Sequence, residues 1–277
     1  MQILITGGSG HLGRHLLESP EAREHAVRVL SRRAHPASAD GAQWVEGDLI
    51  TGEGLVEAVR GVDAIIHAAS DSSAPEDTDV GGTRRLLQAA RDAGVAHLVY
   101  VSIVGIDRIP LPYYARKLDA ERLVRESGVP FSILRATQFH AFIETLLATS
   151  ARLPLVMALP ADLRVQPVAT EEVAARLWRA VRDGPRGMLP DFGGPEAIAI
   201  ADAARLWLAA RGKRRLVVPL PFPGGVVRAL RAGHATVPDG EHGTVGWAEW
   251  LARERSHHTH ADGNGGTFAH PRTPTPG

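Results

Sequence analysis

The sequence contains no cysteine among its 277 residues, which excludes disulfide bonds, thiolate metal sites and cysteine nucleophiles. The absence is typical of proteins that work in a reducing compartment. Basic and acidic residues number 31 each, so no net charge favours nucleic acid or an anionic membrane as a partner. No stretch approaches the ~20 apolar residues that a membrane span needs. We therefore expect a soluble, cytoplasmic protein whose partner is a small molecule, with no nucleic-acid or membrane partner.

Glycine, in contrast, is abundant and patterned near the start of the chain. The apolar run Ile3–Ile5 leads into Gly7, Gly10 and Gly13, and a helical pattern follows. Glycines at these positions allow a sharp turn, a close approach of the backbone to a pyrophosphate, and tight packing of the helix on a sheet. The helix N-terminus then offers free N–H groups to the phosphates. The pattern predicts a dinucleotide site that includes Gly7, Gly10, His11, Leu12 and Gly13.

The second predicted strand, residues 26–30, ends in Ser31-Arg32-Arg33. Sites that prefer NAD place a carboxylate about twenty positions past the glycines, where it binds the ribose 2′-hydroxyl. Two guanidinium groups at that place instead suit a 2′-phosphate. Arg32 and Arg33 therefore predict a preference for NADP(H), with NAD(H) as the alternative cofactor. Two solvated loop arginines would produce the same local pattern.

Further apolar segments alternate with helical ones through residue 135, about six times, which predicts an α/β fold with a Rossmann-like, doubly wound parallel sheet. In such a sheet the ligand lies over the C-terminal strand ends. Asp48 and Leu49 follow one predicted strand, and Ala68, Ala69 and Ser70 follow the next, so we expect all five to meet the cofactor. For Asp48, a role as a helix cap or turn residue is nearly as consistent with the local sequence.

The predicted organisation has three parts. Residues 1–135 form the NADP(H)-binding core, and residues 136–255 form a small C-terminal portion that faces the substrate and is interleaved with the core. Residues 256–277 are rich in His, Gly, Thr and Pro and predict a disordered tail. The tail histidines His257, His258 and His260 would have no fixed geometry, so we expect no specific metal site.

A candidate catalytic group lies in the second half of the core. Ser102 follows a buried strand, and Tyr113 and Lys117 follow in a Y-x-x-x-K spacing that places both on one helix face. An ammonium near a phenol lowers the phenol pKa, so that the phenol becomes a usable general acid or base, and the same ammonium can hold the nicotinamide ribose. Ser102 could hydrogen-bond a substrate carbonyl. The adjacent Tyr114 leaves open which phenol faces the cofactor.

Taken together, these motifs resemble the short-chain dehydrogenase/reductase superfamily, and specifically its atypical, NmrA-like branch of NAD(P)H-binding proteins. The resemblance rests on TGGSGHLG (6–13), SRR (31–33), EGDL (46–49), HAAS (67–70), VYVSIVGID (99–107), YYARKLDAE (113–121) and ILRATQFH (133–140). It implies a Rossmann-like core, NADP(H) binding and a substrate-facing C-terminal portion. Members of this branch include reductases and also cofactor-sensing regulators without turnover.

The retained Ser102, Tyr113 and Lys117 favour an NADP(H)-dependent reductase that delivers hydride to a small, mostly apolar carbonyl or conjugated electrophile. Thr137, Gln138, Phe139 and His140 follow the sixth predicted strand and are the candidate substrate contacts; a lone histidine such as His140 is more often structural. Two alternatives stay open. The first is a non-catalytic NADP(H)-binding sensor that reports to a protein partner, and the second is a nucleotide-sugar epimerase or dehydratase.

Overall fold

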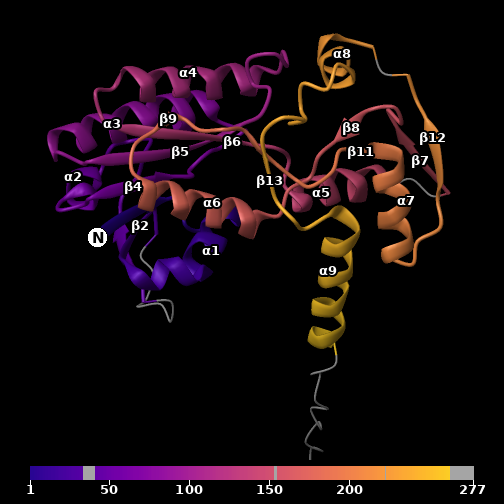
Figure 1. Cartoon of the computed structure of the whole chain (residues 1–277), viewed down its shortest axis with the longest axis horizontal. Helices are drawn as coiled ribbons and strands as arrows, with labels where there is room; N and C mark the ends of the chain where they lie inside the picture. Colours follow the sequence, from indigo (N-terminus) through magenta and orange to yellow (C-terminus); the bar gives the residue numbers. More distant parts are fainter. Residues whose placement is uncertain (34–40, 153–154, 222, 263–277) are drawn as a thin grey trace, which may run out of the picture.

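The computed structural model describes residues 1–33, 41–152, 155–221 and 223–262, with side chains described as far as Arg255. Within these residues, nine strands form one sheet in which every pairing is parallel. Its order is β13-β10-β6-β5-β4-β1-β2-β3, with β9 beside β6 (Figure 1). The strands are β1 (Gln2–Thr6), β2 (Ala26–Ser31), β3 (Gln43–Glu46), β4 (Ala64–His67), β5 (His97–Ile103), β6 (Phe131–Ala136), β9 (Gly187–Met188), β10 (Phe192–Gly193) and β13 (Glu241–His242).

The order of the first six strands confirms the predicted doubly wound fold. The chain passes from β1 outward to β2 and β3, then returns to the other side of β1 to continue through β4, β5 and β6. Ligands of open α/β sheets bind where the strand order reverses in this way. The register pairs Thr6 with His67 at that point, so the ends of β1 and β4 lie side by side.

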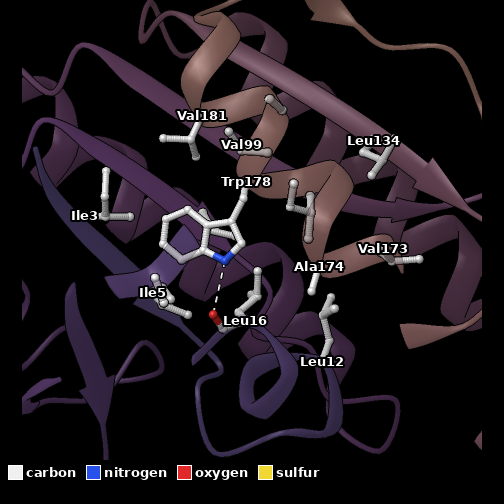
Figure 2. Packing of buried hydrophobic residues seen from close by; sticks show 14 of the residues in the cluster. Ile3, Ile5, Leu12, Leu16, Val99, Leu134, Val173, Ala174, Trp178 and Val181 are labelled. Carbon is white, nitrogen blue, oxygen red and sulfur yellow. Dashed lines mark hydrogen bonds between the residues drawn. The ribbon is translucent and has the colours of Figure 1, made fainter. Parts of the chain in front are cut away.

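Helices cover both faces of the sheet, because its strands are apolar on both sides. One face is covered by α1 (His11–Glu18) and α6 (Thr170–Asp183), and the other by α2 (Leu55–Val59), α3 (Thr83–Asp92) and α4 (Pro112–Glu126). Figure 2 shows the first face, where Trp178 of α6 lies among Ile3 and Ile5 of β1 and its indole N–H donates to the Leu16 carbonyl at 3.1 Å. The Trp178 side chain thus packs α6 against β1 and hydrogen-bonds it to α1.

The remaining elements surround a separate core that includes Met157, Trp207 and Trp247. In Figure 1 most of them lie to one side of the large sheet, and α9 projects below. Strands β10 and β13 come from this late part of the chain and extend the large sheet at its β6 edge. The elements are α5 (His140–Ser150), β7 (Val156–Leu159), β8 (Arg164–Val165), β11 (Ile198–Ala199), α7 (Ile200–Ala210), β12 (Leu216–Pro219), α8 (Gly225–Arg231) and α9 (Trp247–Asp262).

Three local expectations differ from the structure. The sequence suggests a strand over residues 163–168, but β8 covers only Arg164–Val165 because the following residues turn toward the large sheet. The run Thr170-Glu171-Glu172 predicts a capped start for α6, but the helix begins at Thr170 without a side-chain cap, and Glu172 instead accepts a hydrogen bond from the Thr244 amide at 2.6 Å. Helix α9 continues to Asp262, into the segment expected to be disordered, and residues 263–277 lie outside the described residues. Among the described residues, no helix is long and apolar enough to cross a membrane.

Candidate active site

The glycine turn between β1 and α1 lies against the loop that follows β4. Gly7 adopts φ = +75°, and a Cβ on it would lie 2.7 Å from the Ala69 nitrogen. A Cβ on Gly13 would collide with the Gly7 carbonyl and with Gly8, so the first turn of α1 packs directly on the glycine loop. The helix begins after Gly10 with no side-chain cap, which leaves its first N–H groups available to an anionic ligand.

A cavity of about 220 Å³ opens at this turn, where the strand order reverses. It is bounded by the ends of β1, β2 and β4 and by the loop after β3. Its lining includes eight of the residues that the sequence predicted for the cofactor and seven that it did not. The predicted ones are Gly7, Gly10, Arg32, Asp48, Leu49, Ala68, Ala69 and Ser70; the others are Ser9, Leu30, Ser31, Gly47, Ile50, Asp71 and Thr78.

The two arginines have different positions relative to the cavity. Arg32 lines it, whereas Arg33 is exposed and does not belong to the lining. Asp48 also lines the cavity and at the same time closes a turn, since its carboxylate accepts from the Ile50 amide at 2.8 Å. Asp48 therefore lies where it can contact a cofactor and also acts as a turn residue. Arg32 remains as the guanidinium placed to meet a ribose phosphate.

Three further residues predicted for the cofactor lie beside the cavity rather than on its surface. Gly13 packs under the glycine loop, and Leu12 belongs to the core. His11 forms a 2.9 Å hydrogen bond between its Nε2 and the Thr170 hydroxyl of α6. Partial burial lowers the pKa of His11, so a neutral imidazole is favoured at this helix start.

A chain of hydrogen bonds connects the cavity to the candidate catalytic residues. Ser70 lines the cavity, and its hydroxyl donates to the Asp79 carboxylate at 2.6 Å. The Tyr113 hydroxyl lies 2.7 Å from the same Ser70 oxygen. Tyr114, by contrast, packs with Ile109, at the other side of the helix start. The structure thus brings Tyr113, and not Tyr114, into contact with Ser70 beside the cavity.

Lys117 lies behind this chain in a buried position. Its ammonium donates to the Val101 carbonyl at 3.0 Å, lies 3.5 Å from the Asp79 carboxylate and is 4.5 Å from the centre of the Tyr100 ring. Only 4% of the Lys117 residue and none of Asp79 are exposed. Because an isolated buried charge is costly, the ammonium and the carboxylate stabilise each other here.

The pKa of the Tyr113 phenol shifts in the direction opposite to the one expected from the sequence. Burial raises the pKa of Tyr113 above its ordinary value and outweighs the downward effect of the Lys117 charge. The sequence showed the neighbouring ammonium, but it did not show the burial of the ring or the carboxylate of Asp79 behind it. In this structure Tyr113 is therefore a protonated phenol at neutral pH, suited to donate a proton.

Ser102 is buried in β5, and its hydroxyl has no hydrogen-bond partner in the described structure. It does not line the cavity. Tyr100, two residues earlier on the same face of the strand, also has an unpartnered buried hydroxyl. Ser102 thus lies beneath α4, near the Lys117 region rather than at the open rim.

Two of the four candidate substrate contacts are engaged with protein atoms. Thr137 is buried and donates to the Gln166 carbonyl at 2.6 Å. The Gln138 amide donates to the Ala235 carbonyl at 3.1 Å. These bonds fasten the end of β6 to the C-terminal portion, so the polar groups of both residues have structural partners.

The other two candidates are aromatic. Phe139 is partly buried, with its ring 6.3 Å from that of His11. His140 is buried, and its ring stacks on Trp250 at 5.3 Å and on Trp247 at 5.7 Å, with no hydrogen-bond partner for either nitrogen among the described residues. Burial lowers the pKa of His140 to about 4. This packing is that of a core histidine.

The sequence interpretation missed Asp79 and His67. Asp79 lay in a segment expected to be a polar loop, but it belongs to a π-helical turn (Glu76–Gly82) and is fully buried. His67 at the end of β4 bridges the hydroxyls of Thr6 and Thr83 at 2.6 and 2.8 Å. A carboxylate directly before the apolar start of a helix was the available signal for Asp79.

Comparison with known proteins identifies the family. The model of the NAD(P)H-binding family matches residues 7–180. A reductase of (4-alkanoyl-5-oxo-2,5-dihydrofuran-3-yl)methyl phosphate from Streptomyces griseus is 31% identical over 234 residues, which are 83% of this chain and 79% of that one. A 4-hydroxy-2-methyl-3-oxo-4-farnesyl-3,4-dihydroquinoline-1-oxide ketoreductase from Stigmatella aurantiaca is 36% identical over 156 residues. This chain spans about half of that relative, since the match covers 47% of each chain.

Solved structures show the same fold. The NADPH-dependent quinone oxidoreductase from Escherichia coli in complex with NADPH superposes with a TM-score of 0.74 at 20% identity, covering 91% of this chain and 99% of that one. A short-chain dehydrogenase/reductase superfamily protein from Agrobacterium tumefaciens with bound NAD gives 0.71 at 21% identity, covering 95% and 99%. The chain belongs to the NAD(P)H-binding family, and the relatives that it matches over most of their length include a reductase.

Proposed function

We propose that this protein is an NADPH-dependent ketoreductase that reduces a ketone carried on a small, mostly apolar molecule. One observation carries the proposal: the Tyr113 phenol is hydrogen-bonded to Ser70, which lines the dinucleotide cavity. A protonated phenol beside a nicotinamide site is the group that a carbonyl oxygen needs when hydride arrives at its carbon. Burial raises the pKa of Tyr113 and favours this protonated form.

The residues around the cavity fit a dinucleotide. Gly7, Gly10 and the start of α1 would hold the pyrophosphate, because a side chain on Gly7 would fill the space against Ala68 and Ala69. Arg32 would bind the 2′-phosphate that distinguishes NADPH from NADH. Lys117 would reach the nicotinamide ribose only by leaving the Val101 carbonyl and the Asp79 carboxylate, its partners in this structure. The bound cofactor supplies the hydride; the proton is the contribution of the protein.

In the proposed reaction, the substrate carbonyl lies against Tyr113. As the carbonyl carbon gains hydride, the phenol O–H donates its proton to the developing alkoxide, and an alcohol forms. The phenolate then recovers a proton from solvent through Ser70, whose side chain lies at the exposed rim. Ser102 would orient the carbonyl only if its buried, unpartnered hydroxyl became accessible from the cavity.

The printed activities of the relatives support a ketone as the substrate class. One is a ketoreductase, and another, from Stenotrophomonas maltophilia, is a 2-alkyl-3-oxoalkanoate reductase that is 29% identical over 210 residues, or 66% of this chain and 59% of that one. Both names contain a 3-oxo group on a molecule that carries an alkyl or farnesyl chain. We therefore favour ketones with an alkyl substituent over quinones or aldehydes for the first assays.

NADPH oxidation in the presence of 2-alkyl-3-oxoalkanoates, simple alkyl ketones, enones and quinones tests the proposal. We expect turnover with a ketone, and we expect Tyr113→Phe to lower kcat by about 10²- to 10⁴-fold, the usual contribution of general acid catalysis. The Tyr114→Phe variant is the matched control, because Tyr114 packs away from the cavity, and its kcat should stay within a few fold of the parent.

Saturable NADPH binding without turnover across the whole panel would contradict the reductase and support the cofactor-sensing alternative. Equal losses in Tyr113→Phe and Tyr114→Phe would contradict the role of Tyr113. The epimerase alternative predicts turnover of a nucleotide sugar without net consumption of NADPH.

A further inference from the structure

We propose that Asp79 is a positioning residue that keeps Tyr113 in its protonated form and thereby commits the site to proton donation. The proposal rests on the proposed ketoreductase function, and it assigns to Asp79 a role opposite to that of Lys117. An ammonium beside a phenol stabilises the phenolate. A carboxylate that is hydrogen-bonded to the phenol through a serine, and that pairs with the same ammonium, cancels this stabilisation of the phenolate.

The direction of the hydrogen bonds carries the first part of the inference. A serine hydroxyl has only one proton to donate. The Ser70 proton points to the Asp79 carboxylate, which can only accept when it is ionised, across a distance of 2.6 Å. In the 2.7 Å contact between Ser70 and Tyr113, the phenol must then be the donor. The hydrogen bonds therefore run from the Tyr113 O–H to the Ser70 oxygen and from the Ser70 O–H to the Asp79 carboxylate. The carboxylate, which can only accept, thereby keeps the proton on the Tyr113 phenol.

Ionising Tyr113 would break this order. Ser70 would have to turn its proton toward the phenolate and give up a hydrogen bond to a buried carboxylate, which is among the stronger kinds. The Asp79 carboxylate would keep only the Asp71 amide, at 3.1 Å, and Lys117, at 3.5 Å, as partners. Asp79 is fully buried, so water does not replace the lost donor. The arrangement thus favours the phenol.

The charge balance carries the second part. Lys117 of α4 and Asp79 form a buried pair with no net charge, so the phenol sees a dipole rather than an isolated cation. The other groups facing this region are the Tyr100 phenol of β5, the backbone amide of Asp71, and His67 of β4. Burial lowers the pKa of His67 to about 3, so its ring is neutral at pH 7 and adds no positive charge.

A titration of the tyrosines in the protein without substrate tests this inference directly. The chain contains three tyrosines, so ring-labelled tyrosine gives three carbon NMR signals that Tyr100→Phe and Tyr114→Phe assign. In Asp79→Asn, which keeps the size of the side chain and removes its charge, we expect the titration midpoint of Tyr113 to fall by about one pH unit. The alkaline limb of the kcat profile should move down with it.

Asp77→Asn is the matched control, since Asp77 belongs to the same π-helical turn but is exposed. Its Tyr113 midpoint should not change. Asp79→Glu keeps the charge and should retain a midpoint close to that of the parent protein. A Tyr113 midpoint that stays constant or rises in folded Asp79→Asn would overturn the proposal.

Ser70→Ala provides a second test that keeps the charges of both Asp79 and Lys117. If Ser70 accepts the phenol proton as inferred, its removal lowers the Tyr113 midpoint; if Ser70 instead donates to a phenolate, its removal raises the midpoint. A rise, or no change, would contradict the inferred direction even if Asp79→Asn fails to fold. Because these titrations need no substrate, they are independent of the turnover assays: absence of turnover would refute the ketoreductase without altering the Tyr113 result.

Discussion

At the scale of single residues, the structure separates neighbours that the sequence presents as equivalent. Arg32 and Arg33 both follow β2, but only Arg32 lines the cavity; the two lie in a bend after the strand, and the Arg33 amide donates to the Ser31 hydroxyl at 3.2 Å. Tyr113 and Tyr114 separate in the same way at the start of α4, where one phenol reaches Ser70 and the other packs on Ile109. Each pair therefore contains a functional candidate and its own control.

The arginine pair leads to a prediction about cofactor preference. Arg32→Ala should weaken NADPH binding by about 10- to 100-fold and leave NADH binding nearly unchanged, because charge-assisted hydrogen bonds to the 2′-phosphate are lost. Arg33→Ala should change either affinity by less than a few fold. Fluorescence titration of both variants with both cofactors measures this, and equal effects of the two substitutions would show that Arg32 does not select the phosphate.

At the scale of elements, the contact between α5 and α9 depends on a stack of three aromatic rings. His140 of α5 lies against Trp247 and Trp250 of α9, and Trp247 also donates from its indole to the Ala203 carbonyl of α7 at 3.0 Å. The imidazole is buried without a partner, so the neutral ring is favoured and its pKa falls to about 4. Protonation of His140 is therefore unfavourable in the folded stack.

This contact predicts an acid-sensitive stability. In the unfolded chain His140 binds a proton near pH 6.5, whereas in the folded chain its pKa is about 4, so the unfolded state gains protons first as the pH falls. Between pH 7 and pH 5, His140 alone should lower the free energy of unfolding by about 2 kcal/mol. His140→Phe should reduce this pH dependence by that amount in urea unfolding at the two pH values. An equal pH dependence of the free energy of unfolding in the parent protein and in His140→Phe would exclude His140 as the source of that dependence.

At the scale of the whole molecule, one buried glutamine joins the C-terminal portion to the large sheet. Gln166 donates from its side-chain amide to the Gly194 carbonyl at 2.8 Å and accepts from the Val237 amide at 2.6 Å. Its own carbonyl accepts from Thr137 at the end of β6. Four segments that are distant in the sequence thus meet at a side chain of which 3% is exposed.

Replacing this glutamine should destabilise the fold. Gln166→Leu preserves most of the volume but leaves the buried Val237 amide and Gly194 carbonyl unpaired, at about 1–3 kcal/mol each. We expect a loss of about 2–5 kcal/mol in the free energy of unfolding by urea. Gln43→Leu, on the exposed β3, should cost less than about 0.5 kcal/mol. Similar losses in the two variants would contradict the joining role of Gln166.

Much of the core was predictable because its signals are local. The strands β1 to β6 are short apolar runs, the glycines stand at a turn, and Tyr113 and Lys117 are four residues apart on one helix. Each of these patterns depends only on neighbours in the chain. The candidate substrate contacts Thr137 and Gln138 were predicted by position alone, and their hydrogen bonds go to protein segments that lie far along the chain.

The sequence by itself determined the α/β class, the order of strands and helices through residue 135, the glycine turn, and the Tyr113–Lys117 pair. Only the tertiary structure decided that β10 and β13 join the large sheet, since strands of two residues have no detectable period. It also decided that Arg32 lines the cavity, that Tyr113 bonds Ser70 at its edge, and that Asp79 pairs with Lys117. The reason is that burial and charge pairing depend on residues brought together across the fold, and these raise the pKa of Tyr113 where the neighbouring lysine alone would lower it.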